Sequence, residues 1–307
     1  MTPPVPPAGL DLGGRHHDLA TRALVMGILN RTPDSFFDRG AHFALGVFVD
    51  RAAAVVADGA DVLDVGGVKA GPGPEVGLED ELERVVPAVE ALRSRFDLPV
   101  SVDTWNATVA ESAFAAGAVM GNDISGFADP RYLEVAAAAG AAVVATHIRL
   151  APRVPDPDPV YDDVVASVER RLVELAGRAS AAGIPADRIV LDAGLDLGKT
   201  AEQSLDLLRA SDRLARLGHP LLLSASNKTF LGRMLDLDIN ERREASLAAC
   251  ALGIARGCRI LRVHDVAGTR RVRDTVGALL EAGRVARTTA RASASAGSFP
   301  AGGRTSG

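Results

Sequence analysis

Short runs of apolar residues alternate along the chain with longer stretches of helical character. Eight of these runs are predicted to be buried parallel strands, because apolar residues occupy both faces instead of every second position. They lie at residues 23–29, 61–65, 99–102, 118–121, 142–146, 188–191, 221–225 and 259–263. A helix is expected after each strand, at residues 46–58, 78–95, 106–117, 130–140, 160–183, 201–217, 240–257 and 268–283.

Glycines occur where each of several helices should end before the next strand, and a glycine supplies the left-handed cap that stops a helix. They are Gly59, Gly117, Gly140, Gly183, Gly218 and Gly257. Eight strand–helix units favour an α/β fold of the (β/α)8 TIM-barrel type in a single domain. A doubly wound open sheet is the alternative, but no G-x-G-x-x-G follows the first strand.

Composition sets the limits of this domain. The chain has 307 residues, of which 47% are hydrophobic, and this is enough for one large core. We assign the barrel to residues 21–285, a flexible N-terminal segment to 1–20 and a disordered tail to 286–307, where Ala, Ser and Gly dominate.

Charge and hydropathy exclude several kinds of partner. The formal net charge of -5 argues against a general nucleic-acid surface. No secretory signal begins the chain, and no apolar run approaches the roughly 20 residues of a membrane span, so no membrane contact is expected. The two cysteines cannot form a disulfide framework, which favours a cytoplasmic protein.

Polar residues fall at or just after the carboxyl end of each predicted strand. They are Asn30, Asp64, Asp103, Asn122 with Asp123, His147, Asp192, Ser224 and His264. Any one of them could be a capping residue. In a barrel, however, these positions converge on one mouth, where such enzymes build their sites.

The last strand carries a candidate anion site. Strand alternation points Arg262 and His264 to the same side, with Val263 on the other, and a helix begins near Gly268. A guanidinium, an imidazole and a helix N-terminus suit a phosphate or diphosphate. The alternative is an arginine held in a salt bridge across the barrel mouth.

A second group of polar residues suits a different ligand. A carboxylate such as Asp103 or Asp192 can accept two parallel N–H bonds from a cyclic guanidine, and Asn122 offers both a donor and an acceptor. The set fits a flat, amide-like heterocycle, although an acid/base pair or metal ligands are also possible. Lys228 extends toward the same mouth, but a lone lysine there is more often a solvated charge. The loop from Asp192 to Lys199 lacks P-loop spacing.

Together these motifs resemble the dihydropteroate synthase family over residues 23–283. The segment MGILNRTPDSFFD, from Met26, is similar to the family's first-strand signature. Further matches are Ser101-Val-Asp103-Thr104, Asn122-Asp123-Ile124, Asp192 with Gly194, Asn227-Lys228 and Arg262-Val-His264. The family joins 6-hydroxymethyl-dihydropterin diphosphate to p-aminobenzoate and releases diphosphate. A corrinoid-type methyltransferase would share a related barrel, but the Arg262-Val-His264 motif counts against it.

The resemblance implies roles for particular residues. It assigns the pterin to Asp103, Asn122, Asp192 and Lys228. It assigns the diphosphate to Arg262 and His264, and a Mg2+ cofactor to Asn30. Family likeness also suggests a homodimer.

The departures from the family are concentrated on one side of the site. After the second strand the family has G-G-E-S-T-R-P-G, whereas Ala70 and Gly71 replace the Thr and Arg here. Other changes affect the neighbouring loops: Arg31, Thr146, Ala193, Leu195, Asp196 in place of a Gly, and Asn227. We therefore expect a divergent paralogue that binds a pterin diphosphate, with weak or absent dihydropteroate synthase activity. The alternative is a functional dihydropteroate synthase in which Lys69 and Arg31 compensate, so whether the protein is an enzyme stays open.

Overall fold

Eight parallel strands close into a barrel in the computed structural model, which describes residues 9–20, 22–31, 41–71, 73 and 75–296. The strands are β3 (Leu24–Asn30), β4 (Val62–Gly66), β5 (Val100–Asp103), β6 (Met120–Asp123), β7 (Ala142–Thr146), β8 (Ile189–Asp192), β9 (Leu221–Leu223) and β10 (Cys258–Val263). They follow one another around the barrel in chain order, and β10 pairs with both β9 and β3. The predicted (β/α)8 barrel is confirmed.

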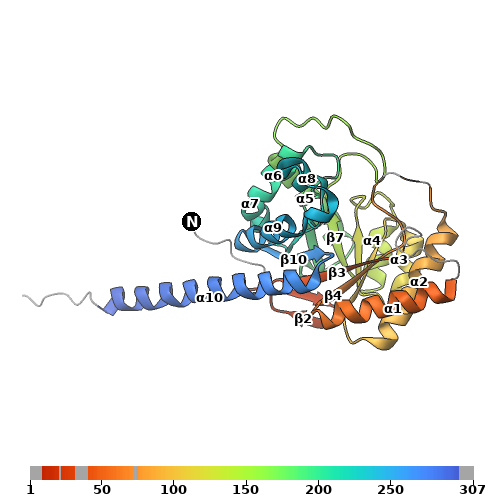
Figure 1. Cartoon of the computed structure of the whole chain (residues 1–307), viewed down its shortest axis with the longest axis horizontal. Coiled ribbons are helices and arrows are strands. Elements are labelled where there is room, and N and C mark those ends of the chain that lie inside the picture. The colour runs from red at the N-terminus through yellow and green to blue at the C-terminus, as the bar shows by residue number, and fades with distance from the viewer. Residues whose placement is uncertain (1–8, 21, 32–40, 72, 74, 297–307) are drawn as a thin grey trace, which may run out of the picture.

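Helices surround the strands (Figure 1). They are α1 (Ala41–Ala57), α2 (Leu78–Arg95), α3 (Ala107–Ala115), α4 (Tyr132–Ala138), α5 (Val164–Ala181), α6 (Ala201–Arg209), α7 (Ser211–Leu214), α8 (Thr229–Leu235), α9 (Arg243–Ala255) and α10 (Val266–Ala296), with 3-10 turns η1 (Ala186–Arg188), η2 (Ala215–Leu217) and η3 (Ile239–Glu241). The helix expected over 201–217 is divided into α6, α7 and η2. The sequence prediction missed α8, which lies in the connection after β9.

The six glycines predicted to end helices all adopt positive φ. Their values run from 62° at Gly140 to 107° at Gly117. This is the left-handed region, which a side chain disfavours. The glycines therefore fix where each helix stops and the chain turns into the next strand.

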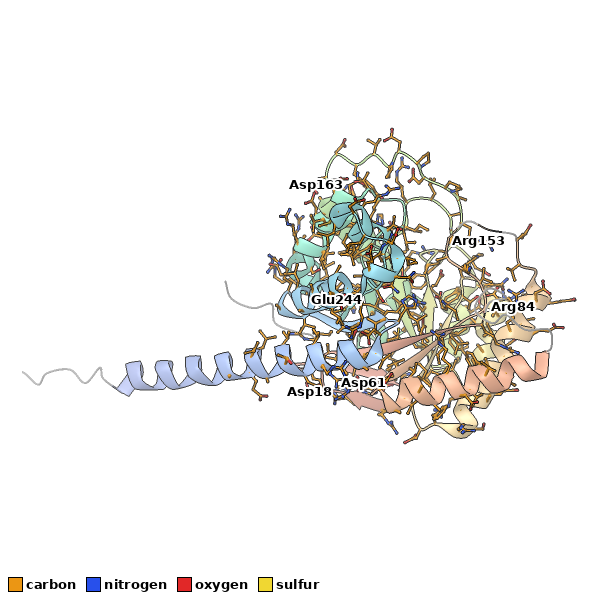
Figure 2. The ribbon with its side chains drawn as sticks, in the orientation of Figure 1. Asp18, Asp61, Arg84, Arg153, Asp163 and Glu244 are labelled. Atoms are coloured by element: carbon orange, nitrogen blue, oxygen red, sulfur yellow. The ribbon has the colours of Figure 1, made fainter. Side chains whose placement is uncertain are left out.

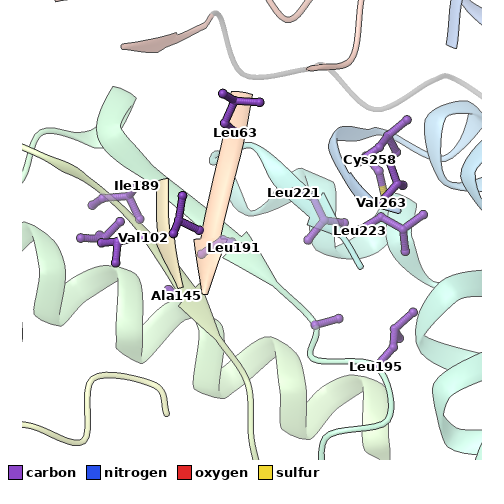
Figure 3. Close-up of a cluster of buried hydrophobic side chains, with 14 of the residues drawn as sticks. Leu63, Val102, Ala145, Ile189, Leu191, Leu195, Leu221, Leu223, Cys258 and Val263 are labelled. Atoms are coloured by element: carbon purple, nitrogen blue, oxygen red, sulfur yellow. The ribbon is translucent and has the colours of Figure 1, made fainter. Parts of the chain in front are cut away.

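Strand alternation separates two apolar layers. Leu63, Val102, Ala145, Leu191, Leu223 and Val263 belong to the layer between the strands and the helices (Figure 3). Met26, Val62, Met120, Val144, Val190, Leu222 and Ile260 form a second cluster inside the barrel. Because this inner cluster takes the earlier positions of the strands, the carboxyl ends are left for polar side chains.

An N-terminal hairpin covers the other end of the barrel. Strands β1 (Leu10–Leu12) and β2 (Arg15–His17) pair antiparallel. Leu10 and Leu12 are buried in the same cluster as the inner strand residues. Asp11 accepts a 2.9 Å hydrogen bond from Nε of Arg188. Residues 10–17 are thus an ordered part of the barrel's base, where the sequence indicated a flexible segment over 1–20; residues 1–8 lie outside the described part.

The C-terminal helix is longer than the sequence indicated. Helix α10 was expected to end near residue 283, with a disordered tail over 286–307, but it continues to Ala296 and projects past the barrel (Figure 1). Residues 297–307 lie outside the described part. Within the described residues, none of the helices combines the length and apolarity needed to cross a bilayer.

Candidate active site

Several of the polar side chains predicted to converge do meet at the carboxyl end of the barrel, whereas Asp123 accepts hydrogen bonds from the backbone of its own loop. The residues that meet there are Asp64 of β4, Asp103 of β5, Asn122 of β6, Asp192 of β8 and Arg262 of β10. All except Arg262 are buried. They form a polar layer directly above the apolar cluster inside the barrel.

Arg262 is the cation of this layer and is held by two carboxylates. Its Nε donates to Oδ2 of Asp64 at 2.7 Å, and its Nη2 donates to Oδ2 of Asp103 at 2.5 Å. Burial alone would lower the pKa of Arg262, but the attraction of Asp64 and Asp103 raises it above its ordinary value. The guanidinium therefore stays charged. The salt bridge across the barrel mouth, which the sequence left as an alternative to anion binding, is present.

Asp103 is poised between its two protonation states. Burial raises the pKa of Asp103 to about 7; Arg262 opposes this rise, and the carboxylates of Asp64 and Glu81 add to it. Asn122 completes the group, because its Nδ2 lies 3.5 Å from Oδ2 of Asp64. A ligand with several N–H donors would meet acceptors on both β4 and β5 here.

Asp192 is fixed by the loop that follows it. The backbone N–H of Gly194 donates to its Oδ1 at 2.8 Å, while burial raises the pKa of Asp192. Gly194 has φ +64°, and a Cβ at this position would lie 1.9 Å from the carbonyl oxygen of His147. No side chain fits there. This explains in physical terms why the Asp192 motif includes a glycine.

Lys228 reaches the layer from the connection after β9. Its Nζ donates to the carbonyl oxygen of Leu195 at 2.9 Å. Burial lowers the pKa of Lys228, although Asp196 and Asp192 act in the opposite direction. The residue therefore lies within electrostatic reach of Asp192 and joins the polar layer, in contrast to the solvated charge that was the alternative.

Asn30 ends β3 beside the same layer. A Cβ placed on Gly66 would lie 3.3 Å from Oδ1 of Asn30 and 3.6 Å from Oδ2 of Asp103. Glycine at position 66 thus keeps a space between these two oxygens. The Thr32, Pro33, Asp34 and Ser35 of the opening motif lie outside the described residues.

His264 lies at the rim, on the strand face that also carries Arg262. Its Nδ1 is 3.0 Å from Oγ of Ser226, and its backbone N–H donates to the same oxygen at 3.2 Å. Val263 between them packs into the outer apolar layer. The predicted alternation along β10 is confirmed, and it brings an imidazole and a guanidinium to one mouth.

Sequence reasoning missed Lys199. This buried side chain donates from Nζ to the carbonyl oxygens of Gly194 at 2.8 Å and Leu197 at 3.0 Å, and lies 3.0 Å from Nδ1 of His147. Burial lowers the pKa of Lys199 to about 7 and, together with the charge of Lys199, lowers that of His147 to about 3. The only signal in the sequence is a Gly-Lys pair at the end of a glycine-bearing loop. Lys199 holds that loop closed over β7 and β8.

A cleft of about 510 Å³ opens beside the polar layer. Lys228 and His264 line it, so it adjoins the layer directly. Ala70 and Gly71, from the loop after β4, form part of its wall. Arg153, on the long loop after β7 (Figure 2), also lines it. The cleft therefore offers space for a ligand next to the polar layer.

Comparisons with known proteins agree with this geometry. The family model described as pterin binding enzyme matches residues 26–264. The inactive dihydropteroate synthase 2 of Mycobacterium leprae is 47% identical over 266 residues, which cover 85% of this chain and 91% of that protein. The chain belongs to the dihydropteroate synthase family.

Other members of the dihydropteroate synthase family are similar over comparable lengths. The dihydropteroate synthase of Synechocystis is 42% identical over 263 residues, covering 85% of this chain and 91% of that enzyme. The crystal structure of Xanthomonas albilineans dihydropteroate synthase with 4-aminobenzoic acid superposes with a TM-score of 0.83 at 39% identity, covering 89% of this chain and 98% of that one. The similar proteins therefore include some named dihydropteroate synthase and some named inactive dihydropteroate synthase 2.

Arg31 does not take the role that the functional alternative gave it. Its Nη1 donates to the carbonyl oxygens of Glu83 at 3.1 Å and Arg84 at 2.8 Å, both on α2. Arg84 in turn donates to the carbonyl oxygen of Gly67 at 3.0 Å (Figure 2). Burial lowers the pKa of Arg31, with a smaller effect of Arg84. The guanidinium is thus used to attach the end of β3 to α2.

Proposed function

We propose that this protein binds a pterin diphosphate in the polar layer and has weak or no dihydropteroate synthase activity. The observation that carries the proposal is the pairing of an intact polar layer with an altered cleft wall. Asp103, Asn122 and Asp192 converge, while Ala70 and Gly71 stand where the family has a threonine and an arginine. The site therefore keeps the residues for binding the pterin but lacks side chains needed for turnover.

The layer suits the pterin ring. The carboxylates of Asp103 and Asp192 can accept the parallel N–H bonds of a cyclic guanidine, and Asn122 can pair with the adjacent heteroatoms. Lys228 can donate to a ring carbonyl or nitrogen from above.

The diphosphate belongs beside Arg262 and His264, and Asn30 is the residue that would hold Mg2+. Mg2+ commonly takes one or two protein oxygens and completes its shell with water and phosphate, and Oδ1 of Asn30 beside Gly66 would be such an oxygen. When bound, Mg2+ would offset the negative charge of the diphosphate. The chain's own contribution is the guanidinium of Arg262, which stays charged in its partly buried position.

Weak turnover follows from the altered wall. Dihydropteroate formation needs a leaving diphosphate to be stabilised and the amine to be positioned, and both depend on preorganised donors. Ala70 and Gly71 offer no side-chain donor. The functional alternative needs a replacement, and the contacts of Arg31 with α2 disfavour this residue in that role.

Two measurements test the proposal. Calorimetric titration with 6-hydroxymethyl-dihydropterin diphosphate should give saturable binding that strengthens with Mg2+. A steady-state assay of p-aminobenzoate-dependent diphosphate release should give turnover far below that of the Synechocystis enzyme. Lack of binding would refute the ligand, whereas near-normal turnover would establish the functional alternative.

Two further features belong to the proposal. Family likeness supports a homodimer, which analytical ultracentrifugation of the full chain tests. The composition and the two buried cysteines, Cys250 and Cys258, support a reducing cytoplasmic location. Fractionation of cells that express the protein tests this location.

A further inference from the structure

Asp196 has an unusual backbone in the loop after β8. Its φ is +65°, in the left-handed region that favours glycine, and the family usually has glycine at this position. Its carboxylate compensates by accepting backbone hydrogen bonds from the connection after β9. Oδ2 accepts from the N–H of Thr229 at 2.5 Å, and both carboxylate oxygens lie 3.3 Å from the N–H of Phe230. Asp196 therefore joins the loops that follow β8 and β9.

The carboxylate of Asp196 lies in the wall of the 510 Å³ cleft and adds a negative charge to that wall. Two lysines, Lys199 and Lys228, also line the cleft, and Asp196 attracts both. Each lysine is already hydrogen-bonded to backbone carbonyl oxygens. An anionic ligand entering here would meet a fixed negative charge beside cations that are already engaged.

One carboxylate of the cleft lining, Asp156, belongs to an ion pair. Nη1 of Arg149 lies 2.7 Å from Oδ2 of Asp156, which lines the cleft. Arg153 contributes a guanidinium at the rim, where its Nη2 would lie 3.2 Å from a Cβ on Gly73. Asp156 is therefore paired with Arg149, and Asp196 is the carboxylate that shares the lining with Lys199, Lys228 and Arg153.

Part of the remaining lining is apolar and accessible, beside polar residues that include Asn227 and Thr229. Leu150 is 41% exposed, Val154 51% and Ile239 61%, and all three line the cleft. Ile148 and Leu197 add to this surface. An uncharged ligand that covers these apolar walls binds favourably, because binding removes their surface from water.

We propose that Asp196 makes the cleft select an uncharged apolar or aromatic ligand over a carboxylate such as p-aminobenzoate. The inference deepens the proposed function and rests on it in one respect, since it takes the cleft as the place of the second ligand. Asp196 would then determine which second ligand binds, an effect separate from the changes at Ala70 and Gly71 in the loop after β4. Repulsion between two carboxylates at close range in a partly enclosed site is enough to reduce affinity roughly tenfold.

The test compares two probes of nearly equal shape on the full chain. Affinities for p-aminobenzoate and for its neutral analogue p-aminobenzamide are measured by calorimetry, with and without the pterin diphosphate. We expect the wild type to bind the amide at least tenfold more tightly than the acid. Asp196→Gly should raise affinity for the acid about tenfold and leave the amide within twofold.

Two further variants keep the result interpretable. Asp196→Asn removes the charge but keeps a side chain that can accept hydrogen bonds, so it should shift the preference in the same direction if Asp196→Gly folds poorly. Asp187→Gly has the same change in net charge, but lies in η1 at the opposite end of β8, and should leave both affinities unchanged.

The outcomes separate this inference from the proposed function. Equal affinity of the wild type for acid and amide, or an equal effect of Asp196→Gly on both, would overturn the inference, as would failure of both probes to bind any variant. The protein could also prefer the amide over the acid and yet fail to bind pterin diphosphate. That result would support the selectivity of the cleft and refute only pterin diphosphate as the first ligand.

Discussion

Arg262 and Asp103 bind each other at 2.5 Å, and this contact joins the residue assigned to the diphosphate with a residue assigned to the pterin. Asp64 holds the same guanidinium from the other side at 2.7 Å. A ligand that takes the Asp103 carboxylate would leave Arg262 with one carboxylate and more available to an anion. The two halves of the proposed ligand should therefore assist each other's binding.

Such coupling is measurable with the two halves as separate molecules. We expect inorganic pyrophosphate to raise the affinity for 6-hydroxymethylpterin about fivefold, which is within the usual range for linked sites. Arg262→Met should abolish the increase. Titration calorimetry with and without pyrophosphate measures it, and an affinity for the pterin that ignores pyrophosphate in the wild type would contradict the coupling.

The protonation of Asp103 should make pterin binding depend on pH. Because the pKa of Asp103 is raised to about 7, its carboxyl is mostly protonated below that pH and cannot accept two N–H bonds. We expect affinity for 6-hydroxymethylpterin to fall about tenfold per pH unit below 7 and to level off above it. Asp103→Asn should remove this pH dependence, so that only the titration of the ligand itself remains. If affinity depends on pH identically in wild type and Asp103→Asn, Asp103 is not the group responsible.

The same group should affect stability in the opposite direction. An acid whose pKa is raised on folding, from its ordinary value near 3.8, stabilises the folded state most below that value. This contribution is lost as pH rises toward 7. The difference in unfolding free energy between wild type and Asp103→Asn, measured in urea, should therefore change between pH 4 and 7 and be constant above 7.

Gly66→Ala should damage the site without unfolding the barrel. Its Cβ would lie 3.3 Å from Oδ1 of Asn30, closer than an ordinary contact, so the Asn30 side chain would be displaced slightly from the position proposed to hold Mg2+. We expect at least tenfold weaker binding of the pterin diphosphate in the presence of Mg2+. Gly177→Ala is a matched control, because nothing lies within 4 Å of its added methyl, and helical alanine is favoured over glycine. Similar effects of both variants would refute this account of Gly66.

Asp64→Ala should destabilise the protein more than loss of a surface ion pair. Asp64 is fully buried and holds a buried part of Arg262, so its removal leaves a charge with one partner fewer, at a cost of about 3 kcal/mol. Asp97 pairs with Arg15 at the surface, and Asp97→Ala should have little effect. Urea unfolding of both variants gives the comparison, and equal midpoints would show that Asp64 is not needed for stability.

Restoring the altered wall should increase turnover. The double substitution Ala70→Thr and Gly71→Arg returns a hydroxyl and a guanidinium to the edge of the cleft. We expect p-aminobenzoate-dependent diphosphate release to rise at least tenfold, with a further increase when Asp196→Gly is added. Unchanged turnover in all three proteins would place the cause of weak activity elsewhere.

The barrel could be predicted from sequence because its signals are local. Strands such as 142–146 are continuously apolar, and glycines such as Gly117 mark helix ends, so strand–helix alternation follows without tertiary information. Convergence of polar residues then follows from the barrel alone. For the same reason, the sequence could predict that Asp103, Asn122 and Arg262 lie together at one end of the barrel.

What sequence missed depends on contacts between distant segments. The hairpin β1–β2 has strands of three residues, too short to show alternation, and it is held by the inner core and by Arg188. The sequence shows Lys199 only as the end of a loop, whereas in the fold backbone carbonyl oxygens of that loop bind its Nζ. Arg31 looked available for ligand binding, and only the position of α2 shows that it is engaged.

The ion pairs of Arg262 also bear on how the chain is synthesised. Its partners Asp64 and Asp103 lie 198 and 159 residues earlier, so a ribosome completes both carboxylates long before their shared cation. A growing chain that has finished β9 still lacks the strand that closes the ring and neutralises the charges at its centre. Because burying unpaired carboxylates is costly, the partial barrel is biased against premature closure. The site and the closed barrel therefore become possible at the same moment of translation.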